Sequence, residues 1–444
     1  MDTTDSPIAV MAPLPLRRRF KRLSEWLAWQ ETLHIKEIEL GLERCKEVAE
    51  RIGLRTPTYQ VVTVGGTNGK GSSVAMLDSI LRAAGYKVAM YTSPHLLRYN
   101  ERLCIGGVPV SDDQLCQAFQ RVDEARGSIA LTYFEFGTLA ALDILQRTAI
   151  DLAVLEVGLG GRLDAVNMID PDVALVTTIG IDHVEWLGQD RAAIAREKAG
   201  IFRAGRPAVC SDPNPPWTLT DQAEQVGSRL YLLGRDYTFE VAGETWSWYS
   251  GPTSYKHLPR PGLCGDHQFQ NAAGVLMVVY TLAERLRVDQ QAIRRGLAGV
   301  KLAGRFQVIP GPVEYILDVA HNPQATGILA QILRQRRARG RTHILIGMLK
   351  DKDTCGVFRA LSGQADHWHV VGLGGRRGAT GEQLAYDLTR VGVTAPIVTY
   401  NDIAQALAAI RSQTVTGDRV LITGSFLTVA GGMKLLEVPQ FYEV

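Results

Sequence analysis

The chain has 444 residues, a formal net charge of +2 at pH 7, 46% hydrophobic residues and 21% charged residues. Its length exceeds what one hydrophobic core usually serves, so we expect two domains. A net charge this small argues against nucleic acid or a membrane surface as a partner.

The six cysteines form no CxxC pair and show no Cys/His spacing typical of a metal site. Isolated cysteines of this kind are typical of reduced thiols in the cytoplasm. No apolar run approaches transmembrane length, and the N-terminal residues show no export-signal pattern. We therefore expect a cytoplasmic protein without a membrane partner, and a monomer.

The most informative segment is 61–73, with the sequence VVTVGGTNGKGSS. A β-branched run breaks into glycines around one lysine and then continues with helical spacing. Glycines let backbone N–H groups turn toward a polyphosphate, and the lysine and the helix N-terminus add positive charge. The segment predicts an ATP site at the residues Gly69, Lys70, Gly71 and Ser72.

The spacing of this loop differs from that of the common P-loop. The common form has a glycine five residues before the Gly-Lys pair and a hydroxyl directly after it. Here Val64 holds the first position, and Gly71 separates Lys70 from Ser72. A plain strand-to-helix turn without a ligand is the alternative.

Around this loop, strand patterns alternate with helix patterns, which favours a parallel sheet with helices on both faces. The expected strands are 59–64, 87–93, 151–157, 172–178 and 206–211. Residues 236–255 predict a small antiparallel appendage, and helices are expected at 271–286 and around 290–297.

A second α/β series follows, with expected strands at 314–319, 343–346, 367–371, 396–398 and 419–423. We therefore predict an α/β protein of two domains. The division is 1–299 for a P-loop parallel-sheet ATPase domain with a small antiparallel appendage, 300–304 for a linker, and 305–444 for a smaller Rossmann-like domain.

Polar residues that directly follow strands are candidates for the site, because ligands gather at the carboxyl ends of parallel strands. Ser93, Glu156 and His183 stand at such positions, as does Lys70 in the loop. Each alone has a structural explanation: a turn before Pro94, a pair with an arginine, or a satisfied histidine. Mg²⁺ prefers few protein ligands, mostly oxygen, and Ser93 and Glu156 suit that preference.

Several motifs resemble one known family in the expected order over residues 35 to 430. They are GTNGKGSS at 66–73, TSPHL at 92–96, LTYFEFGT at 131–138, LEVGLGGRLDAVN at 155–167, DH at 182–183, EKAGIF at 197–202, GRF at 304–306 and DVAHNP at 318–323. The chain resembles the folylpolyglutamate and dihydrofolate synthases, a branch of the Mur ligase superfamily. Mur ligases usually have threonine directly after the Gly-Lys pair, so Gly71 favours the folate branch.

The resemblance implies ATP-dependent amide formation through an acyl phosphate, with L-glutamate as the incoming amine. It implies that Ser93, Glu156 and His183 bind magnesium, in a site for two ions. The lysine matching Lys198 can carry a carboxylate in this family and then hold a second Mg²⁺, although a surface pair is its ordinary role. The catalytic residues implied are Lys70, His183 and Lys198.

The resemblance also implies nucleotide contacts outside the loop, from Asn271 in the first domain and from Arg305, Asp318 and His321 in the second. The segment His321-Asn322-Pro323 has a structural alternative. Asn is a good N-cap and Pro fits the first helical turn, so the segment can be a helix start alone.

Three segments resemble the parts that hold dihydropteroate in the two-activity bacterial enzymes. They are Glu39, Leu40, Gly41 and Leu42; Thr132, Tyr133, Phe134 and Glu135; and Leu163, Asp164 and Ala165. A flat pterin needs an apolar or aromatic wall and a few fixed polar partners, which the second segment can supply. Its aromatic residues can equally be core at the start of a helix. We expect glutamate addition both to dihydropteroate and to reduced folates.

Three alternatives remain open at this point. The enzyme can be a folylpolyglutamate synthase only, or a Mur-type cell-wall ligase, which Gly71 and LTYFE argue against. From another class, a P-loop switch would use nucleotide only to change shape. We find no guanine-recognition motif of a GTPase, and a switch would turn over nucleotide regardless of pterin and glutamate.

Overall fold

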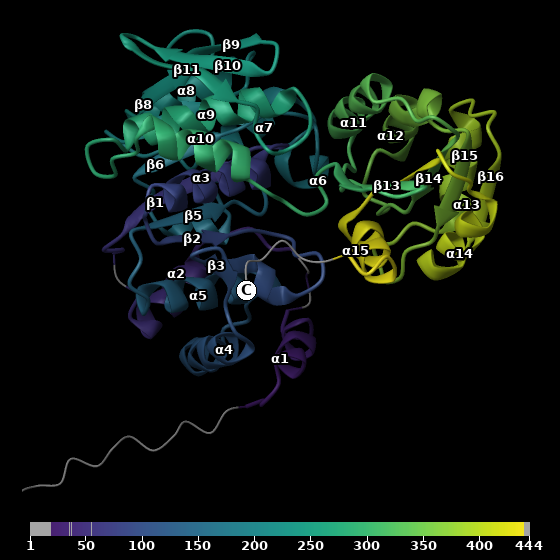
Figure 1. Ribbon diagram of the computed structural model, residues 1–444. Coiled ribbons are helices and arrows are strands. Elements are labelled where there is room, and N and C mark those ends of the chain that lie inside the picture. The colour runs from purple at the N-terminus through teal and green to yellow at the C-terminus, as the bar shows by residue number, and fades with distance from the viewer. Residues whose placement is uncertain (1–18, 35, 37, 55, 439–444) are drawn as a thin grey trace, which may run out of the picture.

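The computed structural model describes residues 19–34, 36, 38–54 and 56–438. Two α/β domains lie side by side, one purple to teal and the other green to yellow (Figure 1). The N-terminal domain contains an eight-stranded and a three-stranded sheet, and the C-terminal domain a six-stranded sheet. The predicted fold class is confirmed.

The eight-stranded sheet has the order β4-β3-β2-β5-β1-β6-β7-β8. The strands β2, β5, β1, β6, β7 and β8 pair in parallel in that order. The strands β3 and β4 continue the sheet beyond β2 as an antiparallel edge. The bounds are β1 Gln60–Gly65, β2 Val88–Tyr91, β3 Leu103–Ile105, β4 Val108–Pro109, β5 Leu152–Glu156, β6 Val173–Val176, β7 Pro207–Cys210 and β8 Arg229–Leu232.

Helices cover both faces of this sheet because its central strands are apolar on both sides. In β1, Val62 and Val64 pack in the core beneath α3 and α9, whereas Val61 packs on the opposite side with α4 and α5. The helices of this domain are α1 Leu23–Gln30, α2 Glu43–Ile52, α3 Lys70–Ala83, α4 Asp112–Arg126, α5 Tyr133–Gln146, α6 Val184–Leu187, α7 Arg191–Ala199, α8 Trp217–Val226, α9 His267–Thr281 and α10 Gln290–Gly299.

The three-stranded sheet is the predicted antiparallel appendage, with β9 Thr238–Ala242, β10 Thr245–Ser250 and β11 Thr253–Pro259. Trp246 and Trp248 alternate toward the core and are fully buried, and the Trp248 indole N–H donates to the Ala273 carbonyl of α9 at 3.1 Å. The helix expected at 271–286 begins and ends earlier than predicted, at 267 and 281.

The C-terminal sheet has the order β12-β13-β17-β14-β15-β16, parallel except for β12. Its two faces are covered by α11 to α13 and by α14 with α15. The bounds are β12 Gln307–Ile309, β13 Glu314–Leu317, β14 Thr342–Ile346, β15 His367–Val371, β16 Ile397–Tyr400, β17 Arg419–Thr423, α11 Pro323–Gln335, α12 Thr354–Leu361, α13 Gly381–Arg390, α14 Ile403–Gln413 and α15 Phe426–Leu435.

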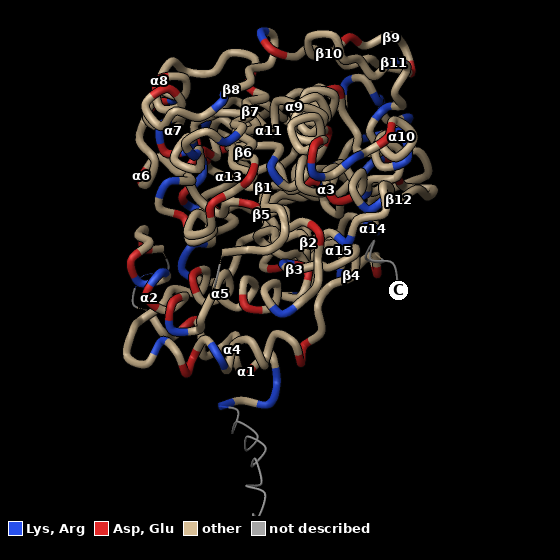
Figure 2. The backbone as a smooth tube through the Cα atoms, turned by 90° about the vertical axis from the view of Figure 1, so that its left-hand side faces the viewer, with Lys and Arg blue, Asp and Glu red and all other residues tan. Residues whose placement is uncertain are grey.

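Basic and acidic residues are interspersed along the backbone of both domains (Figure 2). None of the helices in the described ranges has the length and hydrophobicity that crossing a membrane requires. The parallel strands of each sheet end toward a cavity that is lined by both domains.

Candidate active site

The glycine-rich loop joins β1 to α3 and needs glycine at two positions. Gly66 and Gly69 have φ angles of 144° and 89°, in the region that favours glycine. A Cβ at Gly66 would lie 1.8 Å from Thr177 Oγ1, and one at Gly69 would lie 2.5 Å from Asn271 Oδ1. Asn271 is therefore packed beneath the loop, and it does not line the cavity.

The loop and the start of α3 form one wall of the cavity. All four predicted phosphate-binding residues, 69–72, line it. The Lys70 ammonium donates to the carbonyls of Gly66 at 3.0 Å and Thr67 at 3.4 Å. Gly69 is the N-cap of α3 and supplies no side-chain cap, so the helix N-terminus is open to an anion.

The predicted metal residues line the same cavity: Ser93, Glu156, His183 and Lys198. The Ser93 N–H donates to Glu156 Oε2 at 3.4 Å, which ties the ends of β2 and β5 together. Burial raises the pKa of Glu156, and the charges of Lys70 and Arg305 act against that rise. Among the described residues, no three His, Cys, Asp or Glu side chains meet closely enough to hold a metal ion by themselves.

Lys198 enters the cavity from the last turn of α7 and is 3% exposed. Burial, together with the nearby Lys70 charge, lowers the pKa of Lys198 to about 7. Within the described part of the chain, its ammonium has no carboxylate at ion-pair distance. A substantial fraction of this amine is therefore neutral at pH 7.

Arg305, Asp318 and His321 line the cavity from the C-terminal domain. The Asp318 carboxylate accepts from the Phe306 and Ala320 N–H groups, both at 2.8 Å. These hydrogen bonds fix the carboxyl end of β13.

Arg305 reaches the N-terminal wall. A Cβ at Gly71 would lie 3.7 Å from Arg305 Nη2 and 3.8 Å from Glu156 Oε2, so both groups lie beside the start of α3. The Arg305 guanidinium also stacks on Phe426, 5.4 Å from the ring centre. Arg305 thus supplies a positive charge opposite Lys70.

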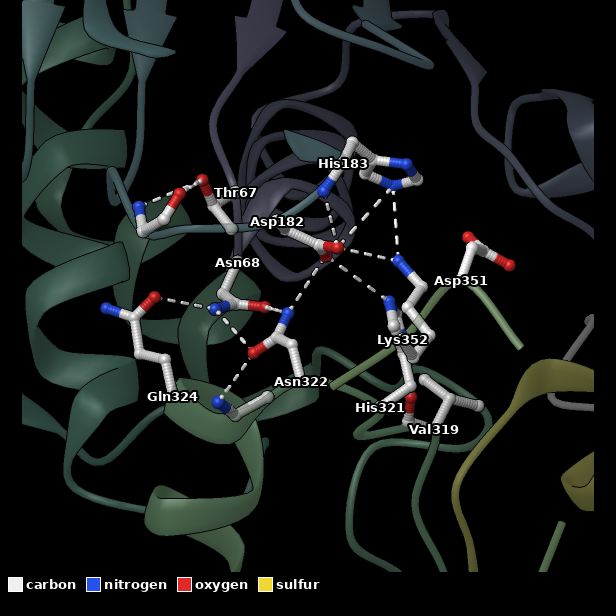
Figure 3. A network of polar contacts seen from close by, with 12 residues as sticks. Thr67, Asn68, Asp182, His183, Val319, His321, Asn322, Gln324, Asp351 and Lys352 are labelled. Atoms are coloured by element: carbon white, nitrogen blue, oxygen red, sulfur yellow. Dashed lines mark hydrogen bonds and ion pairs between the residues drawn. The ribbon is translucent and has the colours of Figure 1, made fainter. Parts of the chain in front are cut away.

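Asp182 joins the two domains (Figure 3). Its carboxylate accepts from the Lys352 ammonium at 2.7 Å and from the Asn322 amide at 3.2 Å, and His321 Nε2 lies 3.8 Å away. Although burial acts in the other direction, the Lys352 charge above all, with smaller effects from His183 and His321, lowers the pKa of Asp182 well below its ordinary value. A second link runs from Asn68 to Gln324 at 2.8 Å.

His183 follows Asp182 in the left-handed region, with a φ of 52°, and is the N-cap of α6. For a non-glycine residue this conformation is strained, and the sharp turn aims the ring at the cavity. Its Nε2 lies 3.4 Å from the Lys352 ammonium. Burial and the Lys352 charge lower the pKa of His183 to about 4, so the ring is neutral at pH 7 and able to ligate a metal.

The sequence prediction did not include Asp182 and Lys352 among the site residues. Both follow strands, Asp182 after β6 and Lys352 after β14, so the strand-end rule that selected Glu156 also applies to them. Their pairing joins positions 170 apart in the sequence, which no local pattern indicates.

Comparisons with known proteins agree with this geometry. Residues 64–279 match the Mur ligase middle domain, and residues 304–426 match the glutamate ligase domain of Mur ligases. The dihydrofolate synthase/folylpolyglutamate synthase of Escherichia coli K12 is 43% identical over 415 residues, which cover 94% of this chain and 96% of that protein. The chain belongs to the dihydrofolate synthase/folylpolyglutamate synthase family.

Solved structures lead to the same family. E. coli FolC in complex with DHPP and ADP superposes with a TM-score of 0.89 at 42% identity and covers 94% of this chain and 98% of that one. A bifunctional folylpolyglutamate synthase/dihydrofolate synthase with Mn, AMPPNP and L-glutamate bound gives a TM-score of 0.87 at 43% identity, with the same coverage of both chains.

The three segments predicted to hold dihydropteroate lie together in this member of the family. The Gly41 N–H donates to the Leu163 carbonyl at 3.4 Å. Arg44 joins the first two segments, because its guanidinium lies 3.4 Å from Glu39 Oε2 and 2.8 Å from Glu135 Oε1. The segments do not line the nucleotide cavity.

Two contacts connect these segments to the cavity wall. Phe134 covers Gly158, where a Cβ would lie 2.7 Å from the ring, and Asp164 accepts from the Leu159 N–H at 2.8 Å. Gly158 and Leu159 both line the cavity. Burial raises the pKa of Asp164 to about 6, although backbone N–H groups act against it.

The segment 132–135 also has the structural role that the sequence left open. Thr132 and Glu135 form a capping box at the start of α5, and each accepts a hydrogen bond from the backbone N–H of the other. Tyr133 packs edge-on against Tyr99 at 5.8 Å between ring centres. A pterin role for these residues stays a prediction.

Proposed function

We propose that this protein catalyses the ATP-dependent addition of L-glutamate to dihydropteroate, which gives dihydrofolate, and to reduced folates. The observation that carries the proposal is the shared cavity. It combines the open N-terminus of α3 and Lys70 with Glu156, His183 and Lys198, and Arg305 of the second domain lines the same cavity. The two activities in the name of the E. coli relative support the same reaction.

The nucleotide would bind with its phosphates against residues 69–72, where backbone N–H groups and Lys70 offer positive charge. Arg305 and His321 would approach it from the C-terminal domain, and Asp318 would hold the chain at that point. Asn271 would act from beneath the loop by keeping Gly69 in place. ADP and AMPPNP in the solved relatives support this assignment.

The residues present fit a divalent metal that shares its coordination with phosphates. Mg²⁺ commonly takes one or two carboxylates and completes its shell with water and substrate oxygens, so the absence of a three-carboxylate cluster does not count against it. Ser93 and Glu156 would hold one Mg²⁺, and His183 with carboxylated Lys198 would hold a second. When bound, the ions neutralise charge on the phosphates.

Carboxylation of Lys198 is part of this proposal. The reaction needs a neutral amine, because the nitrogen lone pair attacks CO₂ and a proton is lost. Burial and the lowered pKa of Lys198 supply that form at neutral pH. The product is an anion, which the nearby positive charge of Lys70 favours.

The proposed reaction has two steps. An oxygen of the acceptor carboxylate attacks the γ-phosphorus, the bond to the β,γ-bridging oxygen breaks, and ADP leaves. The glutamate nitrogen then attacks the acyl carbon, loses a proton, and phosphate leaves. Lys70 and Arg305 would stabilise the negative charge of the transferring group, and the apposed domains would keep water from the acyl phosphate.

Dihydropteroate would bind along Glu39 to Leu42, Thr132 to Glu135 and Leu163 to Ala165. The Phe134 ring on Gly158 gives the aromatic wall that a flat pterin needs at the edge of the catalytic cavity. Asp164, with a pKa near 6, would be a fixed polar partner there.

We also propose the domain division 1–299, 300–304 and 305–444, of which residues 1–18, 35, 37, 55 and 439–444 lie outside the described ranges. The end of α10 at Gly299 and the start of β12 at Gln307 support the linker. A cytoplasmic location and a monomeric state are proposed from the sequence alone.

Product analysis with dihydropteroate as the sole acceptor tests the proposed function. Purified protein with ATP, Mg²⁺ and L-glutamate should form dihydrofolate, and in a second reaction should extend tetrahydrofolate by glutamate. Extension of tetrahydrofolate without any dihydrofolate would reduce the activity to that of a folylpolyglutamate synthase. The dihydropteroate assignments of all three segments would then be withdrawn.

A further inference from the structure

A second cavity, of about 420 Å³, adjoins the catalytic one. His183 lines both cavities, so they meet at that residue. The other residues that line this second cavity come from the segment before α2, from α6, and from two loops of the C-terminal domain. They include Lys36, Ile38, Trp186, Lys350, Arg376 and Arg377. We call it the basic cavity.

Four basic side chains line the basic cavity, against the two acids Glu185 and Asp351. Arg377 pairs with Asp351 at 2.9 Å. Lys350 and Arg376 are exposed, and neither has a carboxylate at ion-pair distance among the described residues; the Lys350 ammonium reaches only the Arg376 carbonyl, at 3.5 Å. Two cations that pair with no carboxylate of the described chain, beside a catalytic cavity, favour an anionic ligand.

One side of the basic cavity is apolar. Trp186 is 40% exposed and Val184 is 44% exposed, and both belong to α6, directly after His183. Ile38 lines the cavity near them. A ligand that alternates carboxylates with methylene groups would satisfy both kinds of surface.

The basic cavity touches both parts of the proposed acceptor site. Lys36, which lines it, donates to Oε1 of Glu39 at 3.1 Å, and Glu39 is the first residue of the proposed pterin segments. His183, which also lines it, belongs to the catalytic cavity as well. A chain that connects a bound pterin to the reacting carboxylate would pass beside this space.

The varying length of the acceptor's glutamate tail makes such a space necessary if one catalytic centre serves acceptors of different size. Dihydropteroate brings its own carboxylate to the centre, whereas a folate with several glutamates brings the carboxylate at the end of its tail. If the pterin stays in place, each added glutamate is surplus chain with one further negative charge. That surplus needs an adjacent, positively charged space.

We propose that the basic cavity holds the poly-γ-glutamyl tail of acceptor folates. The α-carboxylates of the tail would contact Lys350 and Arg376, and its methylene groups would pack on Trp186. This inference rests on the proposed function, because it assumes that the protein extends folates that already carry glutamate.

The test compares the double variant Lys350→Ala/Arg376→Ala with the wild type. Initial rates are measured with dihydropteroate, tetrahydrofolate monoglutamate and tetrahydrofolate triglutamate. We expect the ratio of kcat/KM for the triglutamate to that for dihydropteroate to fall about fivefold to tenfold, as loss of two exposed charge contacts implies, with a smaller fall for the monoglutamate. In the wild type, added KCl should lower the same ratio.

The matched control is Arg337→Ala, an exposed arginine of the same domain outside the basic cavity, which should leave the ratio unchanged. Trp186→Ala gives a second test through the apolar side and should lower the ratio in the same direction. Equal losses with all three acceptors, or an unchanged ratio in the double variant, would overturn the inference.

Two further outcomes separate this inference from its premise. A raised KM for L-glutamate, measured with dihydropteroate as acceptor, would mean that the basic cavity takes the incoming amino acid, and the tail proposal would fail alone. Wild-type protein that ligates none of the three acceptors would refute the proposed function, and the tail site with it.

Discussion

The two walls of the candidate active site differ in how their charged groups are held. On the N-terminal wall, the Lys70 ammonium donates to carbonyls of its own loop, and Lys198 is buried with no carboxylate at ion-pair distance among the residues that the structure describes. Beside His321 of the C-terminal wall, Lys352 and Asn322 are held by Asp182, which belongs to the opposite domain. The first wall is organised within one domain, and the second is positioned by contact between domains.

This difference separates two kinds of effect. Substitutions on the N-terminal wall should remove a charge at the reacting atoms and affect the chemical step. Substitutions in the Asp182 network should change the placement of the second domain and affect several kinetic constants together.

The largest effect is expected for Lys70→Ala. Its ammonium lies at the proposed phosphate site, where the transition state concentrates negative charge, so ligation should fall by about 10³-fold or more. Steady-state kinetics measure the loss, and circular dichroism checks that the fold is retained. Near wild-type turnover would remove Lys70 from the catalytic set.

Lys198→Ala should reduce ligation by about 10²-fold, because the anion that forms on this side chain would be lost. Acetate should restore part of the activity in this variant and not in Lys70→Ala. In the wild type, incorporation of labelled CO₂ should decrease as the pH falls below about 7, where the Lys198 amine becomes protonated. Mass spectrometry of an unmodified lysine in fully active, metal-loaded protein would contradict carboxylation.

Asp182→Asn tests the contact between the walls. It removes the charge that holds Lys352 and should lower kcat/KM about tenfold to a hundredfold through misplacement of the second domain. Small-angle scattering should show a more open average shape, and Lys352→Met should act similarly. If scattering is unchanged and only the affinity for metal falls, Asp182 acts through His183 alone.

Glu156→Gln should have the smallest effect at saturating metal. The amide keeps the shape of the side chain and loses the charge, so the Mg²⁺ concentration for half-maximal activity should rise about tenfold or more. A magnesium titration measures the shift. A titration curve that coincides with that of the wild type would exclude Glu156 as a ligand.

The sequence predicted the parts of the fold that have strong local signals. The glycine loop, the strand-helix alternation and the appendage with Trp246 and Trp248 are as expected, because periodicity and glycine placement determine them locally. The short edge strands β3, β4 and β12 were missed, because two or three residues are too few to show alternation.

For the site, the strand-end rule and the family resemblance selected Lys70, Glu156, His183 and Lys198, which do line one cavity. Asp182 and Lys352 also follow strands, but they were missed because their pairing across the two domains joins positions that no spacing in the sequence connects. The roles of all these residues remain predictions until they are measured.

The most direct test of the account is the fate of the acceptor oxygen. Tetrahydrofolate with both oxygens of its reacting carboxylate labelled with ¹⁸O is incubated with the protein, ATP, Mg²⁺ and L-glutamate, and the released phosphate is analysed by mass spectrometry. Transfer through an acyl phosphate predicts one ¹⁸O atom in each phosphate formed per glutamate added. Phosphate without ¹⁸O, at normal product yield, would contradict the proposed reaction in this cavity.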